Sequence, residues 1–294
     1  MDPESLELGK TAVDSFFKGT IPQIFEAIKE HNKPKQVVRM ARAEIDSLLV
    51  KLKMVGFTEE EAQAVLRPIV LRNLYDANYS GILAKAFPLI ELNAPIEALN
   101  EEWLIFHYER ASRITDNDMQ ALWAKILASE INIPGSFSRQ TLNIVDILDK
   151  TIAQKFTSIG SCLFNIAGEA TLIIPSNYRM VEKFIGVDYD DLLQLESVGL
   201  VHNSESLGGF RTTSDESIID FSYFGKKRII ELRNKYDEKF VLDIGRTILT
   251  SPGTELSKIC GARANSEYFD YILNTYYAEI QKYDDEEDLH EAKV

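Results

Sequence analysis

Two helical patterns of apolar residues, joined by a Pro-Gly break, form the most regular part of this sequence, between residues 115 and 152. In the first pattern the apolar residues recur at steps of three and four, which places on one helical face Met119, Leu122, Trp123, Ile126, Leu127 and Ile131. The stretch Thr115-Asp116-Asn117-Asp118 predicts the helix start, with Asp118 at the third helical position. Pro134 and Gly135 predict its end, because Pro disfavours helix before it and Gly tolerates positive φ.

The second pattern predicts a helix capped by Ser136 or Ser138. This helix is expected to bury Leu142, Val145, Leu148 and Ile152. Together the two patterns predict a helical hairpin whose apolar faces belong to a core.

Helical spacing is also present before residue 75, although Gly and Pro interrupt it. Residues 5–30 form an amphipathic N-terminal arm, and residues 35–54 form a second helix with Lys and Arg towards solvent. A capping box at Thr58 starts a third helix, which we expect to end near residue 73. Residues 75–95 are expected to be less regular.

After residue 150 the pattern changes to shorter elements. Helices are expected at 156–168, 178–186, 188–198, 254–260 and 268–280. A strand is expected after Gly199, which stops the helix at 188–198. β-like runs are found at 218–225, 227–233 and 239–250, with turns expected at Gly225 and at residues 235–237.

This order predicts an α+β fold that is mainly α. An N-terminal helical region is followed by a winged-helix-like C-terminal domain with a small antiparallel β-hairpin or meander. The predicted divisions are residues 1–34, the amphipathic arm; 35–150, the helical domain with its hairpin at 115–150; 151–282, the winged-helix-like domain; and 283–294, an acidic tail.

Composition changes the functional picture in one respect. The formal net charge is −14, and such an acidic surface repels phosphate backbones, so a nucleic-acid partner is disfavoured. The start of the chain is acidic where a signal peptide is basic, and no run reaches the roughly 20 apolar residues that span a bilayer. We therefore expect a cytoplasmic protein, with a peripheral position at the inner membrane as the alternative.

The residue types that carry catalysis show no recognisable arrangement. The four histidines stand apart from one another and from both cysteines, and no phosphate-binding glycine loop is present. We expect His107 to be exposed or to cap a helix, Cys162 to be a buried thiol within a helix, and Cys260 to be unreactive. The sequence predicts no catalytic, cofactor-binding or metal-binding residue and no cofactor.

Two groups of residues are candidates for contact with partners. The first lies in the N-terminal arm and would bind a membrane surface or a second subunit: Phe16, Phe17, Ile21, Ile24 and Phe25. The second is a basic patch for nucleic acid or another partner, formed by Lys226, Lys227, Arg228 and Arg233. The helix that would read DNA, residues 188–198, carries four carboxylates and no Lys or Arg, which favours protein interaction.

The hairpin also carries a resemblance. The run LWAKILASEINIPGSFSRQTL, from residue 122 to 142, resembles a signature of an uncharacterised bacterial family, a domain of unknown function. Ser129 stands where Gly is common, and Gln140 follows Arg139. The runs SYFGKKRIIEL and ILTSPGTEL look like later parts of that family, so the resemblance covers roughly residues 100–265.

A weaker similarity links the arm and hairpin to the Abi-alpha group of abortive-infection proteins, which act in bacterial defence against phage. The resemblances imply a non-enzymatic intracellular binding protein in phage defence or stress response, acting on a protein or a membrane surface. A homo-oligomer or a protein partner is expected. The alternative is a winged-helix transcriptional regulator that binds DNA.

Overall fold

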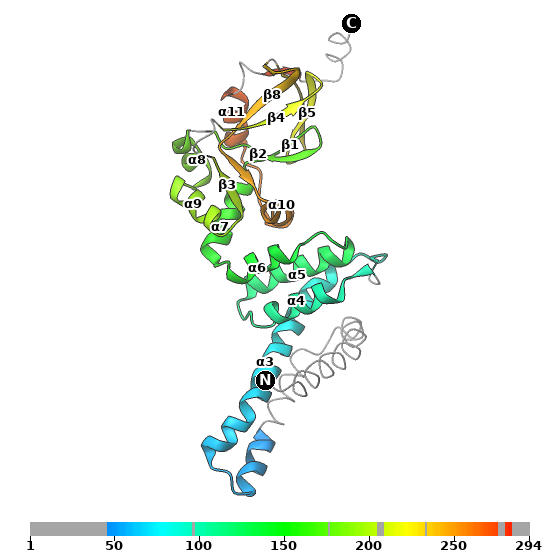
Figure 1. Ribbon diagram of the computed structural model, residues 1–294, viewed down its shortest axis with the longest axis vertical. Helices are drawn as coiled ribbons and strands as arrows, with labels where there is room; N and C mark the ends of the chain where they lie inside the picture. The colour runs from blue at the N-terminus through cyan, green and yellow to red at the C-terminus, as the bar shows by residue number, and fades with distance from the viewer. Residues whose placement is uncertain are drawn as a thin grey trace. The chain divides into compact units, whose positions relative to one another are not determined.

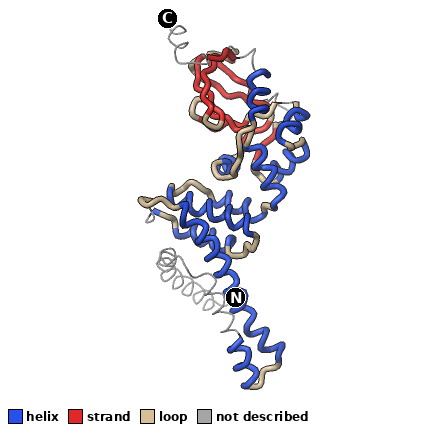
Figure 2. The backbone as a smooth tube through the Cα atoms, turned by 180° about the vertical axis from the view of Figure 1, so that it is seen from behind, coloured by secondary structure: helices blue, strands red, loops and turns tan. Residues whose placement is uncertain are grey.

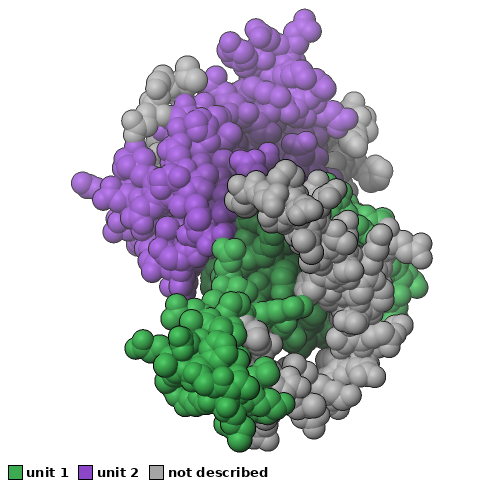
Figure 3. All heavy atoms as spheres, turned by 60° about the horizontal axis from the view of Figure 1, so that its bottom comes forward, with its two compact units in different colours: residues 1–136 green, residues 137–294 purple. Residues whose placement is uncertain are grey.

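The computed structural model describes residues 46–95, 98–175, 177–204, 209–232, 234–275 and 280–283. Contacts within the chain divide it into two compact units, Met1–Ser136 and Phe137–Val294, which Figure 3 colours separately. All of the described strands lie in the second unit (Figure 2). The predicted mixed fold, with a helical N-terminal region and antiparallel sheets, is confirmed.

The first unit is helical. Its elements are α3 (Glu59–Ala86), the 3-10 turn η1 (Phe87–Leu89), α4 (Glu101–Ala111) and α5 (Asn117–Asn132), and residues 46–54 are also helical (Figure 1). α3 packs against α4 and α5, and α5 packs against η1. The buried side chains at this junction include Tyr79, Ile82, Trp103, Leu104, Trp123 and Leu127. The apolar face predicted for α5 is therefore a core face.

Side-chain hydrogen bonds fix these helices to one another. The Asn78 amide donates to the Ser112 carbonyl at 2.9 Å, and the Gln120 amide donates to the Ile114 carbonyl at 2.9 Å. Lys85 donates to Gln120 Oε1 at 2.8 Å. Buried polar groups that find such partners hold the helices in one arrangement.

Two details of the first unit differ from prediction. The less regular segment predicted at residues 75–95 is wrong up to residue 86, because the 28-residue helix α3 continues to Ala86. Tyr79, Ile82 and Ala86 lie on one side of this helix and are buried, so packing outweighs the weak local pattern. Asp116, not Thr115, caps α5, because its carboxylate accepts from the N–H groups of Asp118 and Met119 at 3.0 and 2.9 Å.

The predicted break between the hairpin helices is confirmed. α5 ends at Asn132, and Gly135 takes a positive φ of 85°. The Glu130 carboxylate accepts from the Gly135 N–H at 2.7 Å and from the Ser136 hydroxyl at 3.3 Å. This side chain therefore fixes the turn that follows its own helix.

The second unit combines short helices with three small sheets. Its helices are α6 (Arg139–Ile147), α7 (Lys150–Gly160), α8 (Tyr178–Ile185), α9 (Tyr189–Ser197), α10 (Ser251–Ser257) and α11 (Ser266–Thr275). Its strands are β1 (Leu163–Ile166), β2 (Glu169–Leu172), β3 (Val201–Asn203), β4 (Phe210–Ser214), β5 (Ile218–Tyr223), β6 (Lys226–Leu232), β7 (Lys235–Tyr236), β8 (Lys239–Gly245), β9 (Thr247–Leu249) and β10 (Ile280–Tyr283).

The strand orders are β10-β6-β5-β1-β2, β3-β9 and β4-β8-β7, and every pair is antiparallel. Aromatic residues join the five-stranded sheet to α11. The Phe164 and Tyr223 rings lie 4.7 Å apart between centroids, and Tyr223 stacks on Phe269 at 5.2 Å. The Tyr268 hydroxyl donates to the Ile173 carbonyl. The core of this unit thus lies between α11 and one face of the sheet.

Some elements of the second unit depart from prediction. The helix expected to continue from the hairpin to residue 152 is two helices, because Asp149 caps α7 through the Ile152 N–H at 2.8 Å. The helix expected at 156–168 ends at Gly160, and Cys162 lies in the turn before β1. The helix expected at 268–280 ends at Thr275, and Ile280 begins β10.

Turns account for the remaining differences. The Ala167-Gly168 turn between β1 and β2 has positive φ at both residues, 52° and 90°, as two-residue hairpins require. The turn predicted at Gly225 is confirmed. The turn predicted at 235–237 begins later, because Lys235 and Tyr236 form β7. β4 was not predicted.

Candidate functional site

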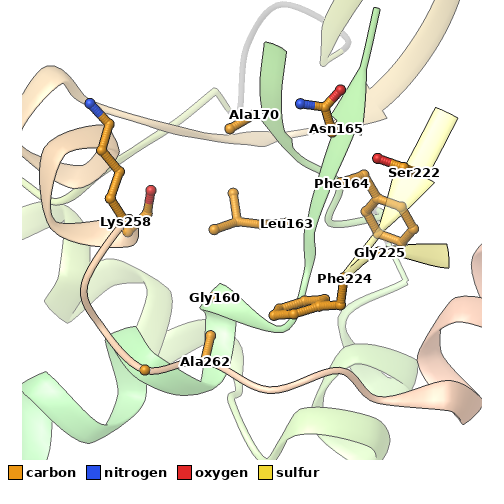
Figure 4. Close-up of a pocket in the computed structure, with 12 residues that line it drawn as sticks. Gly160, Leu163, Phe164, Asn165, Ala170, Ser222, Phe224, Gly225, Lys258 and Ala262 are labelled. Carbon is orange, nitrogen blue, oxygen red and sulfur yellow. The ribbon is translucent and has the colours of Figure 1, made fainter. Parts of the chain in front are cut away.

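A pocket of about 410 Å³ lies in the second unit, where the ends of α7 and α10 meet the five-stranded sheet. Its lining residues are Gly160, Leu163, Phe164, Asn165, Ala170, Ser222, Phe224, Gly225, Ser257, Lys258, Gly261 and Ala262 (Figure 4). The elements that bring these residues together are far apart in the sequence, from α7 to the loop after α10.

The pocket exists because two strands separate. β1 and β5 pair at Asn165–Ser222 and at Ile166–Phe221, and β5 then turns at Phe224-Gly225. Leu163, at the start of β1, therefore has no strand beside it on the β5 side, and Figure 4 shows its side chain within the opening. The other wall is close-packed, since a Cβ added to Gly160 would lie 2.6 Å from Ala262 Cβ.

Hydrogen-bond donors lie at the rim of this pocket. Asn165 accepts from the Gly168 N–H through Oδ1 at 3.1 Å, and its amide nitrogen has no acceptor within the described part of the chain. The same holds for the Ser222 hydroxyl, and Lys258 forms no ion pair with any described carboxylate. Lys227 is the cross-strand partner of Ser222, so it shares the pocket face of the sheet.

Phe224 has two unfavourable properties at this site. It is 46% exposed, and its φ of 45° lies in the left-handed region that bulky residues avoid. Its ring meets that of Tyr223 at 4.8 Å, edge to face. Phe224 and Gly225 form the two-residue turn between β5 and β6, and the positive φ of both residues is the one that such a turn uses.

His107 is buried in the first unit, so the expectation of an exposed or capping histidine is wrong. Its ring stacks on Trp103 with centroids 5.2 Å apart and meets Trp123 edge-on at 5.1 Å. Nε2 lies 3.1 Å from the Trp123 carbonyl, and Nδ1 lies 3.2 Å from the Tyr79 hydroxyl. Nε2 therefore carries the proton and donates to the Trp123 carbonyl, and Nδ1 accepts a hydrogen bond from the Tyr79 hydroxyl.

Burial lowers the pKa of His107 to about 4, although the hydrogen bond to the Trp123 carbonyl opposes this shift. The imidazole is neutral at pH 7 and both nitrogens are satisfied, which makes it a structural histidine. The Trp123 indole N–H is buried and has no acceptor within the described part of the chain.

The burial predicted for Cys162 is confirmed, whereas Cys260 is less buried than expected. Cys162 is fully buried, and burial raises the pKa of its thiol to about 12. Cys260 is partly exposed and its thiol faces the Ser257 carbonyl at 3.3 Å. Among the residues that the structure describes, no group of three or more His, Cys, Asp or Glu side chains is placed to hold a metal ion.

The predicted basic patch is divided by strand alternation. Lys226, Lys227 and Arg228 are successive residues of β6, so Lys227 faces away from the other two. Lys226 Nζ lies 3.4 Å from the Ser266 hydroxyl and 5.6 Å from the centre of the Phe269 ring, on the α11 side. Arg233 lies outside the described residues, as do all five predicted contact residues of the N-terminal arm, Phe16, Phe17, Ile21, Ile24 and Phe25.

The stretches PGSFSRQTL and SPGTEL, which are far apart in the sequence, contact each other. Glu255 of α10 accepts from the Ser138 N–H at 2.7 Å, from the Ser138 hydroxyl at 3.2 Å and from the Thr141 hydroxyl. Gly253 lies against the Leu200 carbonyl, which would be 2.0 Å from an added Cβ. The PGSFSRQTL and SPGTEL stretches therefore form one structural joint between α6 and α10.

The pocket residues were missed by sequence reasoning because 156–168 looked helical. The available signal was the alternation of Phe164 and Ile166 with Asn165, followed directly by Ala167-Gly168. Lys258 and Ser222 are brought to the pocket by tertiary structure, and local sequence carries no trace of that.

Comparison with known proteins gives a family without an assigned activity. No protein of curated function and no solved structure shows significant similarity to this chain. The model of one family, described as "Protein of unknown function (DUF2806)", matches residues 64–273. The match spans both units and more than half of the chain, so this protein belongs to the DUF2806 family.

Proposed function

We propose that this protein works by binding rather than by catalysis, and that it associates with a second copy through a helical hairpin formed by residues 46–74. The observation that carries this proposal is the concentration of exposed apolar side chains on that hairpin. Contiguous exposed apolar surface on a soluble domain marks an interaction site.

The 46–74 hairpin holds nine of the seventeen large apolar side chains that are exposed among the described residues: Leu48, Val50, Met54, Val55, Phe57, Val65, Val70, Leu71 and Leu74. Met54 and Val55 at its tip are 81% and 73% exposed. Val70, Leu71 and Leu74 lie on one side of α3, at helical spacing. An ion pair between Lys53 and Glu59 and the capping box of Thr58 and Glu61 hold the turn.

Charge favours a second copy as the occupant. Residues 46–74 contain four acidic and four basic side chains, so their formal charge is zero, whereas the whole chain carries −14. Two copies repel each other least where this neutral, apolar segment meets its counterpart. A neutral segment also lacks the cationic excess that attracts proteins to anionic lipid.

The biological role that we propose is phage defence or stress response in the bacterial cytoplasm. Its support is the resemblance of the 115–150 hairpin and the N-terminal arm to abortive-infection proteins. Among the described residues, no helix has the length and apolar content to cross a membrane. A peripheral position at the inner membrane is the alternative, and binding to anionic vesicles, lost without residues 1–54, would support it.

Phage challenge tests this role. Cells carrying the protein, the Leu71→Lys/Leu74→Lys variant or an empty vector are plated against a panel of phages. We expect the protein to lower plaque counts for at least one phage and the variant to lose that effect. A control variant, Leu92→Lys/Ile133→Lys, changes exposed apolar residues outside the 46–74 hairpin and should still lower plaque counts. Unchanged plating for every phage would end the defence proposal.

A winged-helix arrangement of the second unit is the finer proposal for its fold. The order α8, α9, β3 and β9 supports it, with β4 to β8 inserted between the two paired strands. This makes DNA binding the second candidate function. α9 carries Asp190, Asp191 and Glu196 and no Lys or Arg. The neighbouring Lys155 of α7 is paired with Asp191 at 2.7 Å, so this surface repels phosphates.

A DNA mobility shift at low salt tests that candidate, because electrostatic binding is strongest there. A shift that disappears on replacing Lys226, Lys227 and Arg228 together would establish β6 as the contact. We expect no shift with the unmodified protein.

A further inference from the structure

The strands β1 and β5 separate at one end, and the pocket lies where they separate. A two-residue turn closes the β1–β2 hairpin at the bonded pair Ile166–Glu169. Because bonded and non-bonded positions alternate along a strand, Asn165 and Leu163 direct their peptide groups away from β2 and towards β5. In agreement with this, the Ala167 N–H donates to a carbonyl of β5 at 2.9 Å.

The last bonded pair expected between these two strands is missing. In steps of two along β1, the pair Asn165–Ser222 is formed. The next pair, Leu163–Phe224, is not formed, because Phe224 has already entered the turn to β6. Within the described part of the chain, the Leu163 N–H and C=O therefore have no backbone partner. Both residues of the missing pair line the pocket, so an open peptide donor and an open peptide acceptor lie together beside it.

The charge at this pocket is close to neutral. Among the described residues that line it, Lys258 is the one that carries a charge. The C-terminal ends of α7 and α10 also line it, and each carries at most about half a negative charge, which offsets the lysine. Figure 4 shows Lys258 across the Leu163 side chain from Asn165 and Ser222, so the lysine is not beside the gap between the strands. The gap therefore favours an uncharged ligand.

Size and apolar lining narrow the ligand further. The volume of about 410 Å³ is in the lower part of the range of roughly 300–1,000 Å³ that small-molecule sites occupy, so the pocket accommodates a residue or two and no folded partner. Leu163, Phe224 and Ala262 supply apolar contact. The Asn165 amide and the Ser222 hydroxyl add neutral hydrogen-bonding groups at the rim.

We propose that this pocket binds an apolar residue of a short extended peptide, which takes the place of the missing strand partner of Leu163. The C=O of the bound residue accepts from the Leu163 N–H, and its N–H donates to the Leu163 C=O. Its side chain contacts Phe224 and Ala262. In peptide addition to an open strand, main-chain hydrogen bonds supply affinity and side-chain contacts supply specificity. The pocket lies wholly within the second unit, so this binding is independent of association through the 46–74 hairpin.

The uncharged probe N-acetyl-leucine N-methylamide tests the proposal, by NMR titration of the isotopically labelled full chain. We expect saturable amide shifts that are confined to the pocket residues and largest at Leu163. The matched ligand is the depsipeptide in which an ester oxygen replaces the leucine N–H. It should bind about five- to tenfold more weakly, because it cannot donate to the Leu163 carbonyl. Equal affinity for the two ligands, or no saturable shift, would overturn the proposal.

Phe224→Asn is the matched protein variant, because Asn-Gly is preferred in two-residue turns and the replacement keeps the turn. It should bind N-acetyl-leucine N-methylamide about fivefold more weakly, since it removes an apolar contact. Ala167→Asn makes the same change in the β1–β2 turn, outside the pocket lining, and should keep the affinity within about twofold. Thermal unfolding verifies that each variant is folded, and the comparison of the two ligands decides if one is not. Unchanged affinity in Phe224→Asn, or shifts spread outside the pocket, would contradict peptide binding at this site.

Discussion

The imidazole of His107 lies between two tryptophans, with both ring nitrogens hydrogen-bonded. The sequence contained the information that this side chain is buried. Trp103, Leu104 and Ala111 stand four and three residues before it and four after it, which is the buried face of α4. Histidine is polar, so composition favoured an exposed position. Its aromatic neighbours outside α4, Tyr79 and Trp123, belong to α3 and α5, and no local pattern reveals them.

The first prediction concerns acid stability. The folded first unit holds His107 neutral down to about pH 4, whereas the unfolded chain protonates it near its ordinary pKa of 6.5. Its contribution is therefore complete above pH 6.5 and is lost as the pH falls to about 4, by on the order of 3 kcal/mol. His107→Gln should be less stable at neutral pH and should lose less stability between pH 7 and pH 4.5.

Tryptophan emission during urea unfolding measures this, since both tryptophans of the chain, Trp103 and Trp123, lie in the first unit beside His107. His202→Gln is the control, because His202 is exposed on β3. Parallel loss of stability in the His107 variant and the unmodified protein would contradict the assignment.

A second residue-scale prediction concerns Glu255, whose carboxylate accepts from three donors at the start of α6. Glu255→Ala leaves those donors without their acceptor and should lower the free energy of unfolding of the second unit by about 1–3 kcal/mol. Amide hydrogen exchange in α6 and α10 measures this locally. Glu238→Ala, at an exposed turn, should have no comparable effect. Equal protection in both variants would show that the joint is not stabilising.

At the scale of elements, caps were more predictable than turns. The capping box at Thr58 and the cap at Ser138, one of the two serines proposed, lie where predicted, because the capping side chain and its target are three residues apart. The β1–β2 hairpin was missed because Ala167 seldom adopts the positive φ that it has here. A helical reading of residues 156–168 was therefore locally reasonable.

Replacing Ala167 tests the turn directly. Ala167→Asn creates Asn-Gly, the preferred pair for this two-residue turn, and should raise stability by roughly 0.5–1 kcal/mol. Ala264→Asn, at an exposed residue of ordinary φ, should bring no gain. Thermal unfolding followed by circular dichroism compares the two. A destabilised Ala167 variant would mean that the turn has another conformation.

At the scale of the whole molecule, the sequence predicted a helical part followed by a mixed part, and it placed the change near residue 150. Contacts divide the chain between Ser136 and Phe137, because α6 packs on α10 through Glu255. That contact joins residues more than 100 positions apart, which local patterns do not report. The same limit applies to the pocket, whose lining residues extend from Gly160 to Ala262. Charge, in contrast, is readable directly, and it distinguishes the neutral 46–74 hairpin from the acidic remainder.

Multi-angle light scattering, which measures molar mass, decides whether the protein associates through the 46–74 hairpin. The unmodified chain should have at least twice the 33.4 kDa mass of one copy, with a dependence on concentration. Leu71→Lys/Leu74→Lys should return it to one copy without changing its unfolding, because both side chains are already about half exposed. Leu92→Lys/Ile133→Lys should leave the larger mass intact. A single-copy mass for the unmodified chain at every concentration, or the same larger mass for the hairpin variant, would rule out association through the hairpin.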